Sequence, residues 1–496
     1  MVANVAGRTA IGAGWLVAWR MASRGLGLIS TLVLARLLLP ADFGIMAMAI
    51  AFTGAVQYLS AIGLLDALIR RPDTGEEWFN TAFGFQALRA VLTGLIIALG
   101  AETAGAWFNE PRLPPILYVL AGTAALSGFE NIGVVQYRRA IDFSVEFRLQ
   151  IVPRLVQFFV MMGLAFVLRD YRAMLVGAVA SAVVRLFMTY RLHPWRPHLP
   201  SVVRLQHWRG LLGFSAWTWA AGLASLVWER CDPFILGPAL GTGNLGRYLL
   251  AAEISIMPLT EIVAPAMAAL YAGISAARAK GTDIAAMTPT LCLALLSLLL
   301  PISIGLSATS GYIVAGLLGP QWEDVRPIIA VFAWVGCLSP INYVCNTILT
   351  AEGRVRRGFY AIAAAAITRV ILMVAVVQTG HIDWAPVAAL VAVFMEVLYF
   401  LSQMRFHAIR WRDHAASAAR LIIAALATVA LFAATGLAWA PVPLDAVMAL
   451  AVGGALGLGG IVVFFTTQVG LWRLMGAPDG AERHVLTLVR SALPRP

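Results

Sequence analysis

The chain has 496 residues, of which 60% are hydrophobic and only 12% are charged. This composition excludes a soluble globular protein and leaves no room for a large soluble domain. The formal net charge of +11 comes almost wholly from arginine, with Lys280 as the one lysine. A soluble protein this basic would suggest nucleic acid, but cytoplasmic loops of membrane proteins also collect Lys and Arg, so we predict no nucleic-acid partner.

Long apolar stretches follow one another along the chain with short polar connections. A membrane-spanning helix needs about 20 mainly apolar residues. Stretches of that length lie at residues 13–38, 43–65, 79–101, 114–136, 149–168, 173–190, 211–233, 247–271, 287–308, 327–349, 358–378, 385–404, 419–440 and 446–468. The sequence therefore predicts an all-α polytopic membrane protein with about 14 transmembrane helices.

The positive charges indicate how these helices are oriented. If the N-terminus is cytoplasmic, the inner loops and tails hold 22 of the 36 Lys and Arg residues and the outer loops hold six. Such a bias is typical of cytoplasmic loops. We expect both termini in the cytoplasm, and we expect the first residues to be retained because no small-residue cleavage site follows a short apolar core.

The chain also repeats itself weakly. Aligning Trp15 with Trp217 brings PADFG (40–44) onto TGNLG (242–246), so Gly44 and Gly246 open the second helix of each copy. Six spans precede a basic linker and six follow it, so the copies are parallel. The predicted domains are a six-helix bundle at 1–190, a cytoplasmic linker at 191–210, a second bundle at 211–412, two additional helices at 413–468 and a cytoplasmic tail at 469–496.

Eight arginines lie inside the apolar stretches, where an unpartnered charge costs roughly 2.5–3.5 kcal/mol at mid-membrane. Arg20 and Arg24 share one face of the first helix, and Arg24, Arg89 and Arg369 fall near mid-depth at a rise of about 1.5 Å per residue. Guanidinium groups there could hold an anionic cargo, or each could be neutralised by a carboxylate of a neighbouring helix. The candidate cargo-binding residues are Arg20, Arg24, Arg89, Arg230 and Arg369. Arg154, Arg185 and Arg420 lie near inner ends, where snorkelling is expected.

Carboxylates inside the spans form a second set. A carboxylate in a membrane is a candidate for proton or ion coupling, unless it forms a structural ion pair with one of the arginines. The candidates are Glu130, Asp232, Glu253, Glu261 and Glu396. Glu253 and Glu261 are favoured because they flank Pro258, which removes a backbone donor and can kink the helix.

No catalytic constellation occurs in the sequence. A GxxxxGK[ST] loop for ATP and an HExxH zinc motif are both missing, and the seven histidines fall in loops or at helix ends. The four cysteines have no metal-ligand spacing and are interpreted as small buried hydrophobes. We therefore expect no enzymatic activity, no metal and no cofactor.

Three tracts carry a family resemblance. Residues 23–52 (SRGLGLISTLVLARLLLPADFGIMAMAIAF) closely resemble the start of bacterial Wzx-type lipopolysaccharide and exopolysaccharide flippases. Residues 229–258 and 318–354 are similar to the second-half signature and the tenth-helix region of that family. The family belongs to the multidrug/oligosaccharidyl-lipid/polysaccharide exporter superfamily.

The resemblance implies two six-helix bundles that form a V-shaped central cavity with alternating access. It implies a cargo, an undecaprenyl-diphosphate-linked oligosaccharide, and a location in the bacterial inner membrane, with a polysaccharide polymerase and chain-length machinery as partners. One alternative is a cation-coupled multidrug antiporter of the same superfamily, against which the excess of intramembrane arginine argues. Another is a membrane-embedded polymerase or ligase, which would need a large outer loop that this chain lacks.

Overall fold

A computed structural model describes residues 2–60, 76–139, 143–198, 216–279, 287–380, 382–404, 411–439 and 445–478. Within these ranges the chain is helical and has no strand. Ten of the described helices are long and apolar enough to cross a membrane. The prediction of an all-α polytopic membrane protein is therefore confirmed.

Each of the fourteen predicted stretches overlaps a described helix. Two of them, 211–233 and 247–271, fall on the single long element α12 (Ala216–Ala279), which is interrupted at Gly241, where φ is 67°. That left-handed backbone suits glycine and divides the element into two helices. The count of fourteen membrane crossings remains a prediction, because length and hydropathy alone support ten.

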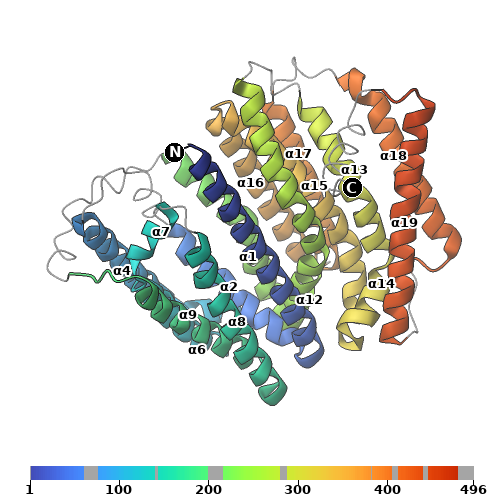
Figure 1. Ribbon diagram of the computed structural model, residues 1–496. Helices are drawn as coiled ribbons and strands as arrows, with labels where there is room; N and C mark the ends of the chain where they lie inside the picture. Colours follow the sequence, from blue (N-terminus) through green and yellow to red (C-terminus); the bar gives the residue numbers. More distant parts are fainter. Residues whose placement is uncertain are drawn as a thin grey trace. The chain divides into compact units, whose positions relative to one another are not determined.

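The chain contacts divide the molecule into two compact units. Unit 1 comprises residues 1–219 and 236–246, and unit 2 comprises residues 220–235 and 247–496. Long helices make up both units, as Figure 1 shows. The domain boundaries predicted from the repeat, including the linker and the two additional helices, remain predictions.

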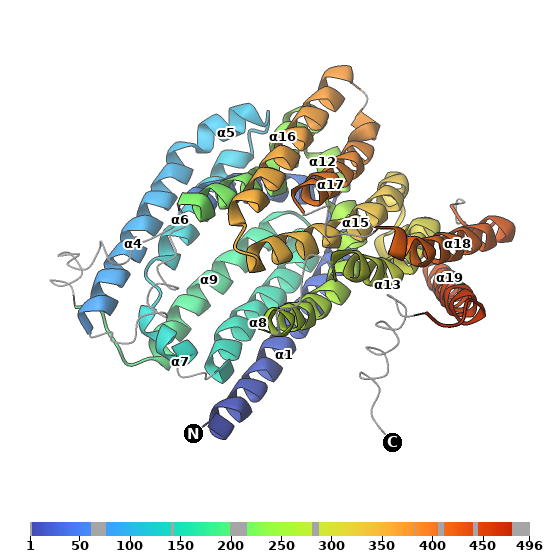
Figure 2. The ribbon, with the colours of Figure 1, turned by 90° about the horizontal axis from the view of Figure 1, so that it is seen from above.

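Unit 1 is built on α8 and α9, which pack along each other, with α1 against α8 and α4 against α6 (Figure 2). Its elements are α1 (Val2–Leu37), α2 (Pro40–Leu59), α4 (Glu76–Leu99), α5 (Ala101–Trp107), α6 (Leu113–Ser127), η1 (Ile132–Val134), α7 (Val135–Arg139), α8 (Phe143–Leu168) and α9 (Arg172–Leu192).

The PADFG tract starts α2 for local reasons. Pro40 occupies the first turn, where no backbone donor is needed. The Asp42 carboxylate accepts hydrogen bonds from the backbone N–H of Leu39 at 3.0 Å and of Tyr171 at 3.2 Å. The same side chain therefore caps α2 and ties its start to the turn before α9.

The two repeat-related glycines contact each other's turns within unit 1. A Cβ on Gly44 would lie 1.8 Å from the Thr242 carbonyl oxygen, and a Cβ on Gly246 would lie 1.9 Å from the Pro40 carbonyl oxygen. Thr242 is the counterpart of Pro40 at the offset that pairs Gly44 with Gly246, so the contact is reciprocal. Only glycine at both positions permits this backbone approach.

Unit 2 contains most of α12 and every later element. Two helix pairs, α16 with α17 and α13 with α15, make its most extensive contacts, and α15 also packs on α17. Its remaining elements are α13 (Thr288–Ala308), α14 (Ser310–Ile313), η3 (Val314–Leu318), η4 (Pro320–Val325), α15 (Arg326–Ala351), α16 (Val355–Thr379), η5 (Ile382–Trp384), α17 (Ala385–Gln403), α18 (Trp411–Thr435) and α19 (Ala446–Leu474).

The last two helices join the core of unit 2 through α13. α18 and α19 lie side by side in both views and each packs on α13 (Figures 1 and 2). Phe432 and Phe464 are fully buried in these contacts, and the Gln468 amide donates to the Ser297 hydroxyl at 2.8 Å. Interhelical hydrogen bonds of this kind stabilise helix packing in a membrane, because lipid is as apolar as the side chains and burial alone drives little association.

Asn131 fastens the end of α6 to the segment after α9. Its side chain is fully buried, donates to the carbonyl oxygens of His193 at 3.3 Å and Trp195 at 2.8 Å, and accepts from the Gly133 N–H at 2.9 Å. Burial of the ring and the charge of Arg196 lower the pKa of His193, so its imidazole is neutral at neutral pH. A neutral ring can accept the Trp195 N–H at Nδ1, as observed at 3.1 Å.

Asn131→Ala is expected to lower the free energy of unfolding by about 3 kcal/mol. The substitution leaves the buried Gly133 N–H without its acceptor, which costs about 1–3 kcal/mol. It also removes the two Asn131 bonds to the carbonyls of His193 and Trp195, which keep Arg196 as their donor. Thermal unfolding of the purified protein measures the loss. Gln57→Ala, which truncates an exposed amide of the same unit, should leave the midpoint unchanged. Equal midpoints for Asn131→Ala and the wild type would contradict the structural role of Asn131.

Candidate functional site

Unit 2 contains a buried ion pair inside the apolar helices. Arg369 on α16 donates from Nε to Asp232 Oδ1 at 2.9 Å and from Nη2 to Oδ2 at 2.6 Å. Tyr248 donates its hydroxyl to Oδ2 at 2.8 Å. The guanidinium also lies over the Trp228 ring, 4.6 Å from its centroid. We call these four residues the acid–arginine cluster.

The spacing along α12 explains how the cluster forms. Trp228 and Asp232 are four residues apart, so they share a helix face and both reach the same guanidinium. The Asp232 side chain is only 7% exposed and that of Arg369 13%. A bidentate, charge-assisted pair satisfies both charges, and a cation–π contact adds to it. The cluster therefore satisfies two charges that would be costly alone in hydrocarbon.

A second buried carboxylate lies close to the cluster. Glu396 on α17 is 7% exposed, and one of its oxygens accepts a short hydrogen bond from the Asn342 amide on α15. The amide oxygen of Asn342, Oδ1, is buried without a hydrogen-bond partner. The positive charge of Arg369 acts on Glu396 from α16. This pair thus has more acceptors than donors.

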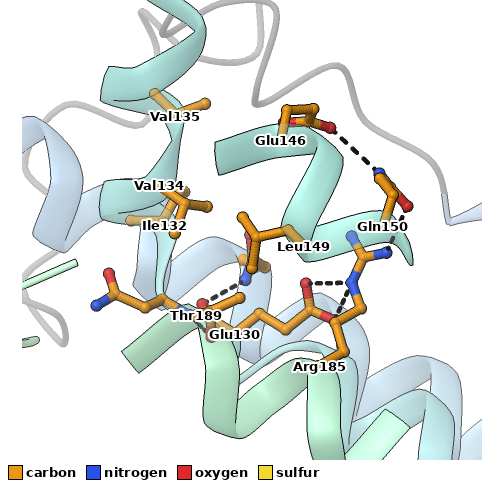
Figure 3. Close-up of a pocket in the computed structure, with 11 residues that line it drawn as sticks. Glu130, Ile132, Val134, Val135, Glu146, Leu149, Gln150, Arg185 and Thr189 are labelled. Carbon is orange, nitrogen blue, oxygen red and sulfur yellow. Dashed lines mark hydrogen bonds and ion pairs between the residues drawn. The ribbon is translucent and has the colours of Figure 1, made fainter. Parts of the chain in front are cut away.

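Unit 1 has a pocket lined by α8, α9 and η1 with its flanking residues, and by Gln86 of α4, shown in Figure 3. Arg185 Nε lies 2.9 Å from Glu130 Oε1, and Arg185 Nη1 donates to Gln150 at 3.4 Å. Gln150 donates in turn to Glu146 at 3.2 Å. The pocket encloses about 70 Å³, which is room for a few water molecules.

The lining of this pocket limits its chemistry. Glu130 is already paired, and Leu149 and Ile132 provide apolar wall between the polar groups. Across the described residues, no group of three or more His, Cys, Asp or Glu side chains is placed to hold a metal ion. The pocket suits water or the hydroxyl groups of a ligand rather than a metal.

The structure distributes the candidate arginines among different surroundings. On α1 the side chains of Arg20 and Arg24 are both exposed. Arg89 and Arg230 are half-buried, each with its Nε atom unbonded. Arg369 is held by Asp232, which is the alternative that the sequence left open for it.

Two of the arginines expected to snorkel make internal contacts. Arg185 pairs with Glu130, and Arg420 is 2% exposed and donates to the Ser417 hydroxyl at 2.8 Å. Arg154 lies against α1, with Nη2 3.3 Å from the position of a Cβ on Gly27. The small residue Gly27 on α1 leaves room for the Arg154 side chain, which the depth estimated from the sequence does not reveal.

The carboxylates also separate. Asp232 and Glu130 are each paired with an arginine, whereas Glu253 is exposed and Glu261 is half-buried. Glu396 is buried beside an amide. A role in proton or ion coupling remains a prediction for each of these carboxylates. The packing favours Glu396 among them. Burial does not support the preference for Glu253 and Glu261, which flank Pro258.

Sequence reasoning missed the neutral residues of both sites. Tyr248, Trp228 and Asn342 complete the unit 2 contacts, and Gln150 links Arg185 to Glu146 in the unit 1 pocket. Asn342 offered a signal, because it is one of two asparagines within an apolar span. Tyr248 and Trp228 offered none, since aromatic residues are common in membrane helices for other reasons.

Known proteins resemble this chain over most of its length. It is 21% identical over 328 residues to "Teichuronic acid biosynthesis protein TuaB" of Bacillus subtilis (strain 168), covering 66% of this chain and 68% of that protein. It is also 21% identical over 361 residues to "Lipopolysaccharide biosynthesis protein WzxC" of Escherichia coli (strain K12), covering 71% and 72%.

The fold has a counterpart among solved structures. The lipid II flippase MurJ in an inward closed conformation aligns with a TM-score of 0.71 at 13% identity, covering 92% of this chain and 99% of that one. At this identity the likeness shows the fold. A family model described as "Polysaccharide biosynthesis protein" matches residues 33–327. Because that match spans more than half of the chain, the protein belongs to the polysaccharide biosynthesis protein family, as its resemblance to Wzx-type flippases predicted.

Proposed function

We propose that this protein is a flippase that moves an undecaprenyl-diphosphate-linked oligosaccharide from the cytoplasmic to the outer leaflet of a bacterial inner membrane. The family, the transport and biosynthesis proteins among its relatives, and the MurJ-like fold support a lipid-linked saccharide as the cargo class. Both termini would face the cytoplasm, and a polysaccharide polymerase with its chain-length machinery would use the flipped product.

The observation that carries the proposal is the arginine pair on α1. Arg20 and Arg24 lie one turn apart on a single helix face, and both side chains are exposed. A diphosphate presents clustered anionic oxygens, which accept bidentate hydrogen bonds from guanidinium groups. Two exposed guanidinium groups one turn apart can bind such a headgroup together.

The other candidate arginines would contribute differently. Arg89 and Arg230 each have an unbonded Nε, but it is buried, so a ligand oxygen would reach it only after the surrounding side chains move. Arg369 already gives two donors to Asp232, which also balances its charge, so it would contact the cargo only if that pair opened. Alternating access would then carry the bound headgroup across while the prenyl chain remains in lipid.

Arg24→Glu is expected to reduce flipping by at least tenfold, because reversing a charge at a phosphate contact removes a charge-assisted bond and adds repulsion. The assay uses the purified protein in liposomes with a fluorescent undecaprenyl-diphosphate glycan and an external quencher. Arg24→Lys should give an intermediate rate, since lysine keeps the charge but loses the bidentate geometry.

Arg191→Glu provides the matched control, because Arg191 is an exposed arginine in the last turn of α9. It should flip cargo at the wild-type rate. Quenching that is independent of the protein would contradict the transport proposal, and unaltered flipping by Arg24→Glu would contradict only the contact assigned to Arg24.

A further inference from the structure

The carboxylates of unit 2 differ in how fully their oxygens are bonded. Asp232 accepts two hydrogen bonds from Arg369, one from Tyr248 and a weak one from the Cys231 thiol at 3.4 Å. It has no remaining capacity for a proton. Glu396, equally buried, has the Asn342 amide as its hydrogen-bond donor.

The Glu396–Asn342 pair lacks one donor. A carboxylate only accepts hydrogen bonds, and the amide of Asn342 has two donors on nitrogen and an acceptor on oxygen. That oxygen is buried and unbonded, and such a group costs about 1–3 kcal/mol. A protonated carboxyl group can donate to an amide oxygen while it accepts from the amide nitrogen. One proton on Glu396 therefore supplies the donor that the pair lacks.

Burial favours proton binding by Glu396, and the charge that opposes it, that of Arg369, is itself paired. Arg369 on α16 is the charged group that acts on Glu396, and its charge is balanced by Asp232. From α15, Glu396 meets the neutral Asn342 amide, with the buried Cys345 thiol in the hydrophobic cluster that includes Val397. On its own helix, Tyr399 shares a hydrogen bond with the Thr368 hydroxyl.

With Glu396 ionised, the two carboxylates and one guanidinium have a net charge of −1, and with Glu396 protonated they are neutral. Glu396 lies about 10 Å from one end of α17 and about 17 Å from the other, at a rise of about 1.5 Å per residue. A net charge at that depth is unfavourable. A metal ion would need more oxygen ligands than this pair offers, and the described residues provide no such group.

We propose that Glu396 and Asn342 form a proton-binding site inside unit 2, and that binding and release of this proton drive the transport cycle. The second part rests on the proposed flippase function, whereas the first does not. The proton comes from water on one side of the membrane and adds to the Glu396 carboxylate without any other bond change.

The site itself is tested without cargo by infrared spectroscopy of the protein in nanodiscs across a pH titration. The wild type should show a protonated-carboxyl band that disappears in Glu396→Gln and shifts in frequency in Asn342→Leu. Glutamine can make both hydrogen bonds to Asn342, so the variant should fold. Glu253→Gln, which changes an exposed carboxylate of α12, should retain the band. A spectrum of Glu396→Gln identical to the wild type would overturn the site.

The coupling is tested in liposomes with the fluorescent glycan and an imposed gradient of about two pH units. One proton per cycle would allow a leaflet ratio of cargo up to about a hundredfold in the wild type. Glu396→Gln should give about equal leaflets with and without the gradient. Wild-type leaflet ratios that do not change with the gradient would overturn the coupling. If neither the wild type nor any variant flips the cargo, the flippase proposal is contradicted and the infrared result still stands.

Discussion

Asp232→Asn is expected to destabilise the protein by about 3–5 kcal/mol. The substitution removes the charge that balances Arg369 and leaves a guanidinium unpaired within apolar helices, and breaking one side of a buried ion pair costs about that much. Size-exclusion chromatography after heating, or thermal unfolding in detergent, should show a large fall in the midpoint.

The double variant Asp232→Asn with Arg369→Met should recover most of the loss. Replacing a whole buried pair by neutral groups is often close to neutral in free energy, so the two substitutions should be strongly non-additive. Asp324→Asn is the control, because Asp324 forms an exposed pair with Arg247 at 3.5 Å in the same unit and should cost less than about 1 kcal/mol. Additive losses in the double variant would contradict a coupled pair.

Gly44→Ala is expected to be the most disruptive single-methyl change in unit 1. Its Cβ would lie 1.8 Å from the Thr242 carbonyl oxygen and 2.6 Å from the carbonyl carbon. Backbone atoms cannot rotate away as a side chain can, so the helices must separate. Overpacking typically costs about 1–3 kcal/mol, and a backbone clash of this size should reach or exceed the upper end.

Gly246→Ala should behave alike, because its Cβ meets the Pro40 carbonyl oxygen in the reciprocal contact. Gly243→Ala is the matched control on the same turn, since a Cβ there has no neighbour within 4 Å. It should be neutral or slightly stabilising, as alanine favours helix over glycine. Equal thermal midpoints for Gly44→Ala and Gly243→Ala would contradict the close approach.

Much of the fold was predictable because a membrane restricts the options. Backbone groups in hydrocarbon must be satisfied internally, so an apolar stretch of sufficient length forms a helix whatever its neighbours do. All fourteen predicted stretches overlap helices for this reason. The repeat also predicted that Gly44 and Gly246 are equivalent, but their reciprocal packing could not be predicted, since it depends on which backbones approach each other.

The polar sites were only partly predictable. Burial in apolar segments pointed to Arg369, Asp232 and Glu396 as residues that need a partner, but it did not say which partner. Arg369 and Asp232 are 137 residues apart in the sequence, and no local pattern links residues at that distance. Glu253 and Glu261 were favoured from a nearby proline, yet Glu253 is exposed and Glu261 is only half-buried.

The sequence by itself determined that this is a helical membrane protein of the polysaccharide biosynthesis family with charges inside its spans, because hydropathy and segment length depend only on residues close in the chain. The tertiary structure decided how those charges are satisfied. A guanidinium or carboxylate in an apolar bundle takes whichever partner packing brings within about 3 Å, and packing is a property of helices far apart in the sequence. For that reason Arg20 and Arg24 emerge as the exposed pair, Arg369 as half of an ion pair and Glu396 as the carboxylate that lacks a donor.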